Sequence, residues 1–264
     1  MSRSGYYAWS SRRPTARQLE NEQLLSLIRV LQRRGLDNYG SPRMTRELCA
    51  HGYPCSENRV ARIMRENGLF ARTARLFRKK PHRGEYYRAA GNLLRGQPAP
   101  TAVNQVWVAD ITYIKTPEGW LYLVAFMDLF SRRIVGWSIG QARDTVLAMG
   151  TFISAWRARG CPSKLIVHTD QGIEFLNKEF KDVLRRCAVT QSTSRRGRCH
   201  DNAHMESFFH SMKNETLKLN RVTSHADARA RIANFMDDFY NHKRRHSSLG
   251  FLSPIQYESL SIAG

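Results

Sequence analysis

Residues 106–139 constrain the fold more than any other part of the sequence, because three β-rich runs follow one another there with only short turns between them. Pro117-Glu118-Gly119 is typical of a hairpin turn between the first two runs. The expected elements are strands at 106–115, 120–129, 133–139, 164–168 and 188–193, and helices at 144–158, 175–187, 202–218 and 224–243. A meander followed by alternating helix and strand predicts an α/β domain on one mixed, five-stranded sheet with flanking helices.

Two carboxylates occupy strand positions where a charge is costly. Asp110 lies inside the first apolar run, and Asp170 follows a short strand, at the end where α/β sheets usually bind ligands. Glu206 lies in a predicted helix with an apolar stripe. Each alone has an ordinary interpretation, as a turn former, a helix cap or a solvated acid. As a set, three carboxylates on adjacent elements fit two Mg²⁺ ions acting on a phosphodiester.

The charge of the chain points to the same kind of substrate. Lys and Arg total 42 against 22 Asp and Glu, which gives a net charge of +20, with the excess concentrated in residues 1–100. Such an excess favours a polyanionic partner, since each neutralised phosphate releases counterions. Five scattered cysteines without a CxxC pair argue against a disulfide framework or a Cys-rich zinc site. No segment has the apolar length of a signal or membrane span, so we expect no membrane and a reduced, cytoplasmic setting.

A small helical module precedes the α/β domain. Its third predicted helix begins after Ser56 as the N-cap and carries Arg59, Arg62 and Arg65 on one side. The module resembles a DNA-binding helix-turn-helix unit, although a helical bundle with a solvated basic face has the same pattern. We therefore divide the chain into an N-terminal arm (1–18), this module (19–70), a basic linker (71–104) and the α/β domain with a C-terminal helix and tail (105–264).

Four sequence blocks carry a specific resemblance. They are WVADITY at 107–113, HTDQG at 168–172, RGRCHDNAHMESFF at 196–209 and YNHKRRHSSLG at 240–250. With them the chain resembles the retroviral-integrase-like transposases of bacterial insertion sequences, in particular the second-frame product (OrfB) of the family named after insertion sequence three. The 35 residues between Asp170 and Glu206 match the spacing of that family's Asp-Asp-Glu triad. The similarity covers almost the whole chain.

The resemblance implies a fold, a reaction and partners. The fold is the ribonuclease-H-like fold of integrase cores, with Asp110, Asp170 and Glu206 as the catalytic triad holding two Mg²⁺, for which Mn²⁺ would substitute. In the implied reaction, metal-activated water cuts a DNA strand at the element's 3′ end, and the freed 3′-hydroxyl attacks another phosphodiester. The implied partners are element ends and target DNA, a second copy in a dimer or larger oligomer, and the upstream-frame product (OrfA), separate or fused. The implied location is the bacterial nucleoid.

Further candidates for DNA contact lie near the triad and in the family motifs. They are Arg195, Arg196, Arg198, Asn202, Lys213 and Arg244. Lys213 stands two helical turns after Glu206 and either meets a phosphate or is solvated. Arg244 either packs or contacts DNA. Asp201 is a rival carboxylate that we expect at the start of the Glu206 helix.

The sequence departs from the family pattern at two places, and two other functions remain possible interpretations. His200 stands where the family often has Tyr, and Glu174-Phe175 stands where Gln-Tyr is common. One rival is a ribonuclease-H-like nuclease that hydrolyses nucleic acid without joining strands. The other is a catalytically silent DNA-binding regulator, against which the intact triad argues.

Overall fold

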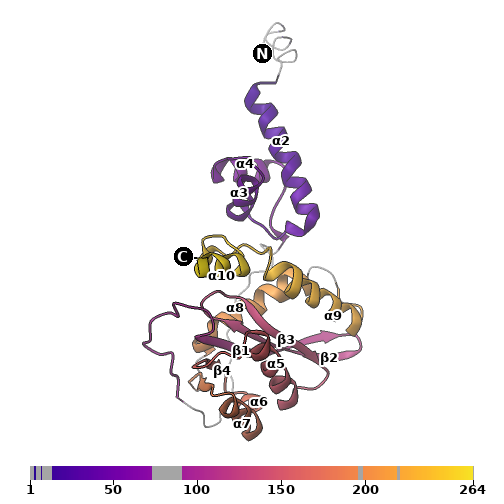
Figure 1. Cartoon of the computed structure of the whole chain (residues 1–264). Coiled ribbons are helices and arrows are strands. Elements are labelled where there is room, and N and C mark those ends of the chain that lie inside the picture. Colours follow the sequence, from indigo (N-terminus) through magenta and orange to yellow (C-terminus); the bar gives the residue numbers. More distant parts are fainter. Residues whose placement is uncertain are drawn as a thin grey trace. The chain divides into compact units, whose positions relative to one another are not determined.

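The computed structural model describes Arg3, Tyr7 and residues 14–72, 91–195, 199–218 and 221–263. The chain separates into two compact units, Met1–Phe77 and Arg78–Gly264 (Figure 1). Most of the predicted arm and residues 73–90 of the predicted linker fall outside the described residues. No described helix is both long and apolar enough to span a membrane.

The first unit is a small helical module, as predicted. Its elements are α2 (Ala16–Leu31), a π-helical turn (Gln32–Leu36), α3 (Ser41–Ala50) and α4 (Glu57–Glu66). Thr15 and Gln18 form a capping box at the start of α2, and the Ser56 side chain accepts from the Arg59 N–H at the start of α4. These caps satisfy N–H groups that a helix leaves free. The three helices bury a common apolar core that includes Leu24, Ile28, Met44, Leu48, Val60 and Ile63.

The second unit is built on the predicted five-stranded mixed sheet. The strands are β1 (Val106–Thr116), β2 (Gly119–Asp128), β3 (Ile134–Gly140), β4 (Ile166–Thr169) and β5 (Thr190–Thr193), in the order β3-β2-β1-β4-β5. β1, β2 and β3 form the antiparallel meander, and β4 and β5 continue it in parallel with β1. The described part of the chain therefore confirms both the fold class and the strand pattern.

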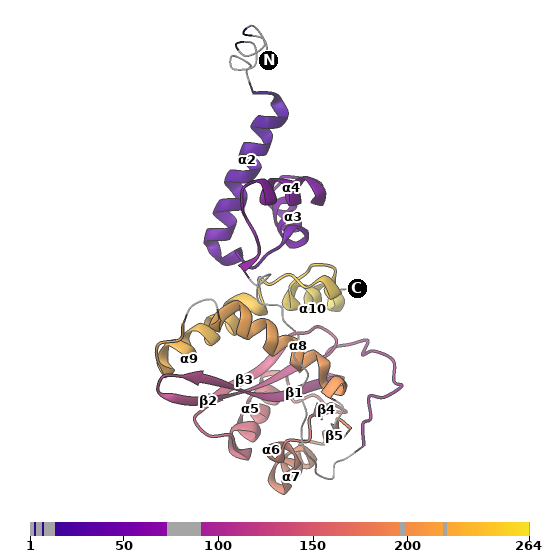
Figure 2. The same ribbon diagram turned by 180° about the vertical axis from the view of Figure 1, so that it is seen from behind.

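Helices cover both faces of this sheet (Figures 1 and 2). On one face lie α5 (Thr145–Ala158), α6 (Ile173–Leu176) and α7 (Lys178–Arg186), and on the other lie α8 (Ala203–Met212) and α9 (His225–Ala233). Side chains alternate between the two faces along a strand. Trp107 and Ala109 accordingly join the core under α5 and α7, whereas Val108 and Ile114 join the core under α8 and α9.

Three predicted helices differ in detail. The helix predicted at 175–187 is two helices, because Asn177 between them has an extended backbone (φ −61°, ψ 149°). The two long helices predicted at 202–218 and 224–243 begin as α8 and α9 but end in π-helical turns, at Lys213–Leu217 and Asn234–Tyr240. Among these three, the helix is interrupted only at Asn177, whereas the π-helical turns directly continue α8 and α9. Hydrophobic periodicity does not predict either feature.

Part of the predicted linker lies against the sheet. The Leu93 N–H donates to the Ser192 hydroxyl at 3.0 Å, and the Thr193 N–H donates to the Gly91 carbonyl at 3.4 Å. Gly91 and Leu93 thus contact β5, and residues 91–104 belong to the same compact unit as the sheet.

A buried ion-pair network fixes the last helix, α10 (Pro254–Ala263), to the sheet. The Glu258 carboxylate accepts from Ser131 Oγ (2.8 Å), Arg133 Nη1 (2.7 Å) and Arg159 Nη1 (2.9 Å). Only 6% of the Glu258 side chain is exposed, so these partners replace the water it would otherwise bind. Burial raises the pKa of Glu258, but hydrogen bonds from Arg159 and Arg133 outweigh it and hold the pKa below its ordinary value.

We predict that Glu258→Gln lowers the free energy of unfolding of this unit by about 3 kcal/mol at neutral pH, because two guanidinium groups lose their buried anion. The pKa of Glu258 is depressed in the folded state, so its contribution is present above the unfolded-state pKa and is lost as pH falls through the folded-state pKa. Urea unfolding at pH 7 and pH 3 measures both effects. The exposed Glu179→Gln is the control, and equal stability of the two variants at pH 7 would contradict the prediction.

Candidate active site

The pairing of β1 with β4 brings Asp110 and Asp170 together. The two strands run parallel with Ala109 opposite Thr169, and the aspartates are the next residue on each chain. Neighbouring strands lie about 4.8 Å apart, so the aspartates stand side by side where β4 ends. Both side chains are half-buried.

Glu206 approaches the same place from α8. The Asn202 side chain donates from Nδ2 to the carbonyl of Ala109 at 3.0 Å and so ties the start of α8 to the residue before Asp110. Glu206 follows Asn202 by four residues and shares its helix face. Its side chain is exposed, and its charge is one of the causes that raise the pKa of Asp110.

The electrostatics of the two aspartates oppose double ionisation. Burial raises the pKa of Asp110, and the neighbouring Asp170 carboxylate raises it further. Burial also raises the pKa of Asp170, although the Gly172 N–H at 2.9 Å and the Arg143 guanidinium act against this. Two adjacent carboxylates in a partly desolvated site lack enough positive charge, which is the condition that a divalent cation relieves.

The side chains at this site therefore offer the kind of ligand atom that a divalent metal ion binds. Asp110 and Asp170 supply the oxygen ligands that Mg²⁺ prefers. Within the described ranges, however, no three His, Cys, Asp or Glu side chains stand close enough to hold one ion together. The structure thus pairs two carboxylates and places the third, Glu206, on a neighbouring helix.

Arg143 and Glu174 are members of the site that the sequence reasoning missed. Arg143 lies just before α5, and its Nε is 2.7 Å from Glu174 Oε1. Glu174 is buried, whereas 45% of the Arg143 side chain is exposed. No sequence signal marks Arg143, whereas Glu174 stands where Gln is common in the family. The ion pair stands beside the aspartates, because a Cβ added to Gly172 would lie 2.9 Å from Asp170 Oδ1 and 3.2 Å from Arg143 Nη2.

His168 is fully buried and holds β4 against the segment that contains β5. Its Nδ1 lies 2.8 Å from Ser192 Oγ and its Nε2 lies 3.1 Å from Ser194 Oγ. Burial lowers the pKa of His168, which favours the neutral ring. Both ring nitrogens are occupied, so His168 supports the strand that carries Asp170 and is not positioned as a metal ligand.

Two residues predicted to contact DNA face inward instead. Asn202 is buried and bonded to β1. Arg244 is buried as well, and its guanidinium binds Glu215 through two hydrogen bonds of 2.9 and 2.6 Å. A buried, paired guanidinium does not neutralise a phosphate, and a buried amide bonded to β1 is not available to DNA. The predicted DNA contact is therefore corrected for both residues: each holds parts of the protein together.

The basic residues before α8 are only partly described. Arg195 binds Asp201 through its backbone N–H, Nε and Nη2, each at 2.9 Å. The Asp201 carboxylate therefore pairs with Arg195 rather than capping α8, and this pairing lowers the pKa of Asp201. Arg196 and Arg198 lie outside the described residues. Lys213, at the end of α8, stands with its Nζ 4.7 Å from the centre of the Tyr113 ring.

The three arginines of the helical module differ from one another. Arg59 binds Asn21 Oδ1 and Glu20 Oε2, both at 2.8 Å, and so joins α4 to α2. Arg62 lies near Glu66, and its side chain is 42% exposed. Arg65 is exposed. Arg62 and Arg65 are thus the arginines of α4 that face solvent.

Comparison with known proteins agrees with this architecture. Two models described as "Integrase core domain" match residues 100–199 and 187–254, and one described as "HTH-like domain" matches residues 18–77. A cryo-EM structure of a simian T-cell lymphotropic virus intasome in complex with PP2A regulatory subunit B56 gamma aligns with a TM-score of 0.51 at 17% identity. That alignment covers 81% of this chain and 70% of the intasome chain. These likenesses define the class: an integrase core behind a helix-turn-helix-like module, the architecture of a polynucleotidyl transferase.

The sequence relatives define the family. The transposase InsF for insertion sequence IS3A of Escherichia coli (strain K12) is 38% identical over 265 residues, which span 100% of this chain and 92% of InsF. An uncharacterized 31 kDa protein of insertion element IS600 from Shigella sonnei is 37% identical over 257 residues, spanning 97% and 94% of the two chains. The chain belongs to the IS3 family of transposases.

We predict that Arg143→Gln destabilises this unit by about 1–3 kcal/mol, because it leaves the buried Glu174 carboxylate without its cation. The lower part of this range applies, since Arg143 is partly exposed and screened by solvent. The double variant Arg143→Gln/Glu174→Gln restores most of the loss, because two neutral amides can pair. Urea unfolding measures each variant, with the exposed Arg186→Gln as the control. A double variant no more stable than Arg143→Gln would show that the pair does not act as argued.

Proposed function

We propose that this transposase cleaves DNA at the 3′ ends of its insertion sequence and joins those ends to target DNA, with Asp110, Asp170 and Glu206 holding two Mg²⁺ ions or, in their place, Mn²⁺. The observation that supports this most is the β1–β4 register, which sets Asp110 beside Asp170 at the end of β4. Asn202 supports the third ligand, since it ties the face of α8 that carries Glu206 to β1.

The chemistry is two phosphoryl transfers in sequence. In the first, water attacks a phosphodiester and breaks its bond to the 3′ oxygen, which leaves a 3′-hydroxyl on one side of the break and a 5′-phosphate on the other side of the same strand. In the second, that 3′-hydroxyl attacks a target phosphodiester, so one new phosphodiester forms and a target 3′-hydroxyl is released. When bound, the metal ions would help deprotonate the attacking hydroxyl and stabilise charge on the leaving oxygen.

The protein's own side chains position the reacting groups. Asp110 and Asp170 present adjacent carboxylates on two strands, and the Gly172 N–H holds Asp170 Oδ1 in place at 2.9 Å. The positive charge of Arg143 partly offsets the negative charge of Asp110 and Asp170, and its ion pair with the buried Glu174 holds Arg143 in place. Lys213 extends from the end of α8 to a phosphate beside the triad. No covalent protein–DNA intermediate is required, so no Ser or Tyr nucleophile is assigned.

DNA contact is shared between the two units. In the helical unit, the solvent-facing Arg62 and Arg65 of α4 are the residues we propose for phosphate contact, and Arg59 holds α4 in place. Joining requires two element ends held at once, so we propose at least a dimer on DNA. We also propose OrfA, as a separate chain or as a fusion, as a partner in recognising the ends.

The test is a gel assay with a labelled duplex that carries a 3′-hydroxyl end of the encoding element, a supercoiled plasmid target and Mg²⁺. We expect label joined to the plasmid, and no product when EDTA removes the metal. Asp170→Asn should lower both cleavage and joining by about 10³-fold or more while its affinity for the duplex stays within about twofold. The exposed Asp238→Asn is the matched control and should behave as the wild type.

Each other outcome points to a rival function. Plasmid nicks without joined label would identify a nuclease of ribonuclease-H type. Binding without either product would identify a catalytically silent regulator. Unchanged cleavage by Asp170→Asn would show that the triad assignment is wrong.

A further inference from the structure

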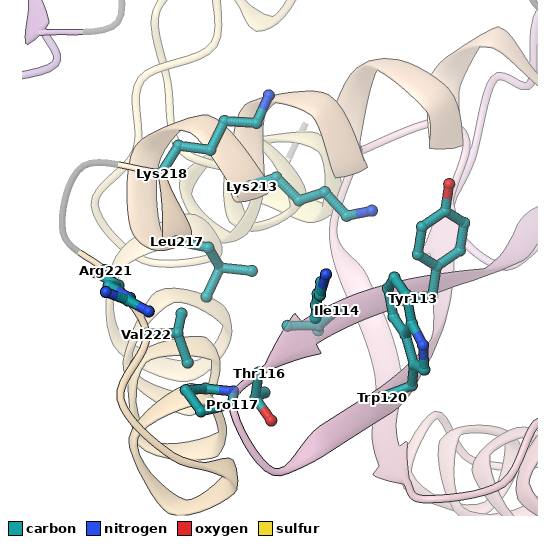
Figure 3. Close-up of a pocket in the computed structure, with 11 residues that line it drawn as sticks. Tyr113, Ile114, Thr116, Pro117, Trp120, Lys213, Leu217, Lys218, Arg221 and Val222 are labelled. Carbon is teal, nitrogen blue, oxygen red and sulfur yellow. The ribbon is translucent and has the colours of Figure 1, made fainter.

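A pocket lies next to the proposed active site and is lined by different residues. It has a volume of about 580 Å³ and is walled by the β1–β2 hairpin and by the chain that follows α8 (Figure 3). Its floor is apolar, from Ile114, Leu217 and Val222. Tyr113 and Trp120 lie side by side at one end, and Lys218 and Arg221 lie at the other. None of the three triad carboxylates lines the pocket, and Lys213 is the one lining residue that the proposed function also uses.

The pocket exists because β1 extends beyond the end of its parallel neighbour, β4. Pairing of β1 with β4 ends at Ala109, so within the described chain residues 110–116 pair with β2 alone. Tyr113 and Trp120 stand on this projecting hairpin, 56% and 47% exposed, with their rings 5.3 Å apart in an edge-to-face arrangement. Two large aromatic side chains this exposed and this close together form a surface that a ligand can cover.

The lining of the pocket is strongly cationic. Lys115, Lys213, Lys218 and Arg221 all contribute to it, and among the described residues no Asp or Glu lines it. Lys213 Nζ stands 4.7 Å from the Tyr113 ring centre and Lys115 Nζ stands 6.0 Å from the Trp120 ring centre. Each ring therefore has an ammonium group close to it, so one ligand can meet an aromatic face and a positive charge together.

Two elements run from the proposed active site to the pocket. Tyr113 follows Asp110 by three residues on β1, a distance of about 10 Å along an extended strand. Lys213 follows Glu206 by two turns of helix. A nucleic-acid strand that passes the carboxylates thus reaches the aromatic pair after a short span.

We propose that this pocket binds unpaired nucleotides at the DNA end being processed, with their bases against Tyr113 and Trp120 and their phosphates against Lys115, Lys213, Lys218 and Arg221. This rests on the proposed function, because it assumes that a DNA end lies at Asp110 and Asp170. A lysine tip that moves from its ring to a phosphate opens that ring to the base. The site favours an end whose last base pairs are already separated.

Unpaired DNA fits this pocket better than a duplex does. In a duplex the base faces are stacked on one another, whereas an unpaired nucleotide exposes a face that an aromatic side chain can cover. A positively charged groove combined with aromatic rings is the usual means of binding single strands without sequence preference. A second copy of the chain is a poorer occupant, since the net charge of each chain is +20.

The test compares three labelled DNAs that share one duplex, using the full-length protein in EDTA so that no cleavage occurs. One DNA has a blunt end, one has three unpaired thymidines at the end, and one has three abasic units there, which keep the phosphates but lack bases. Fluorescence anisotropy should show that the thymidine tail binds about tenfold more tightly than the abasic tail. The double variant Tyr113→Ala/Trp120→Ala should bind the two tails equally and the blunt duplex as the wild type does.

Three control variants separate the loss of base stacking from misfolding. Tyr113→Phe and Trp120→Phe retain aromatic rings and should retain the preference, which separates stacking from misfolding. Tyr53→Ala removes an aromatic side chain that is 45% exposed in the helical unit and should change nothing. Equal binding of both tails by the wild type, or a preserved preference in the double variant, would overturn the proposal.

Three further outcomes are decisive as well. If the double variant keeps the tail preference and instead shifts the monomer–dimer balance of DNA-free protein in ultracentrifugation, the pocket is an interface between copies and the proposal is wrong. Joining without any tail preference would overturn the base-binding site alone. A tail preference without joining would overturn the proposed function alone and leave the binding site standing.

Discussion

The structure depends on one constraint: two carboxylates occupy adjacent positions on neighbouring parallel strands of a sheet. Parallel pairing of β1 and β4 fixes Asp110 beside Asp170, and the cores on both faces of the sheet hold that register. Sliding either strand by one residue would move apolar side chains to the wrong face, so the position of the pair is as rigid as the fold. The pair lacks positive charge, and this lack is the physical reason for the metal-dependent reaction on DNA that we propose.

Several neighbouring side chains position Asp110 and Asp170. The buried His168 bridges two serines and so aligns β4, while Asn202 fastens α8 to β1 through the Ala109 carbonyl. Arg143 supplies one cation and is held by a buried Glu174. His168 acts from the strand that carries Asp170, and the other side chains act from other elements, so the site is preorganised by packing and hydrogen bonds before any ligand arrives.

Much of this was predictable from the sequence, and the exceptions have a common cause. The strand pattern and the mixed sheet follow from the β-rich runs and the turns between them. The grouping of Asp110 and Asp170 in one site was implied by the family resemblance. Arg143 was not predictable, since its partner lies 31 residues away and nothing in its local sequence sets it apart. Asn202 and Arg244 were assigned to DNA because they lie in family motifs. A motif does not distinguish a side chain that binds a ligand from one that is satisfied inside the protein.

The most direct test of the carboxylate pair is the thermal unfolding of full-length wild type and Asp110→Asn, each with EDTA and with Mn²⁺, at pH 8. If two like charges oppose each other until a cation binds, the variant is the more stable protein in EDTA. Mn²⁺ at about 100 times its Kd should raise the midpoint of the wild type by roughly 5 °C or more and leave the variant almost unchanged. A wild type indifferent to Mn²⁺, or a variant less stable than the wild type in EDTA, would contradict the account.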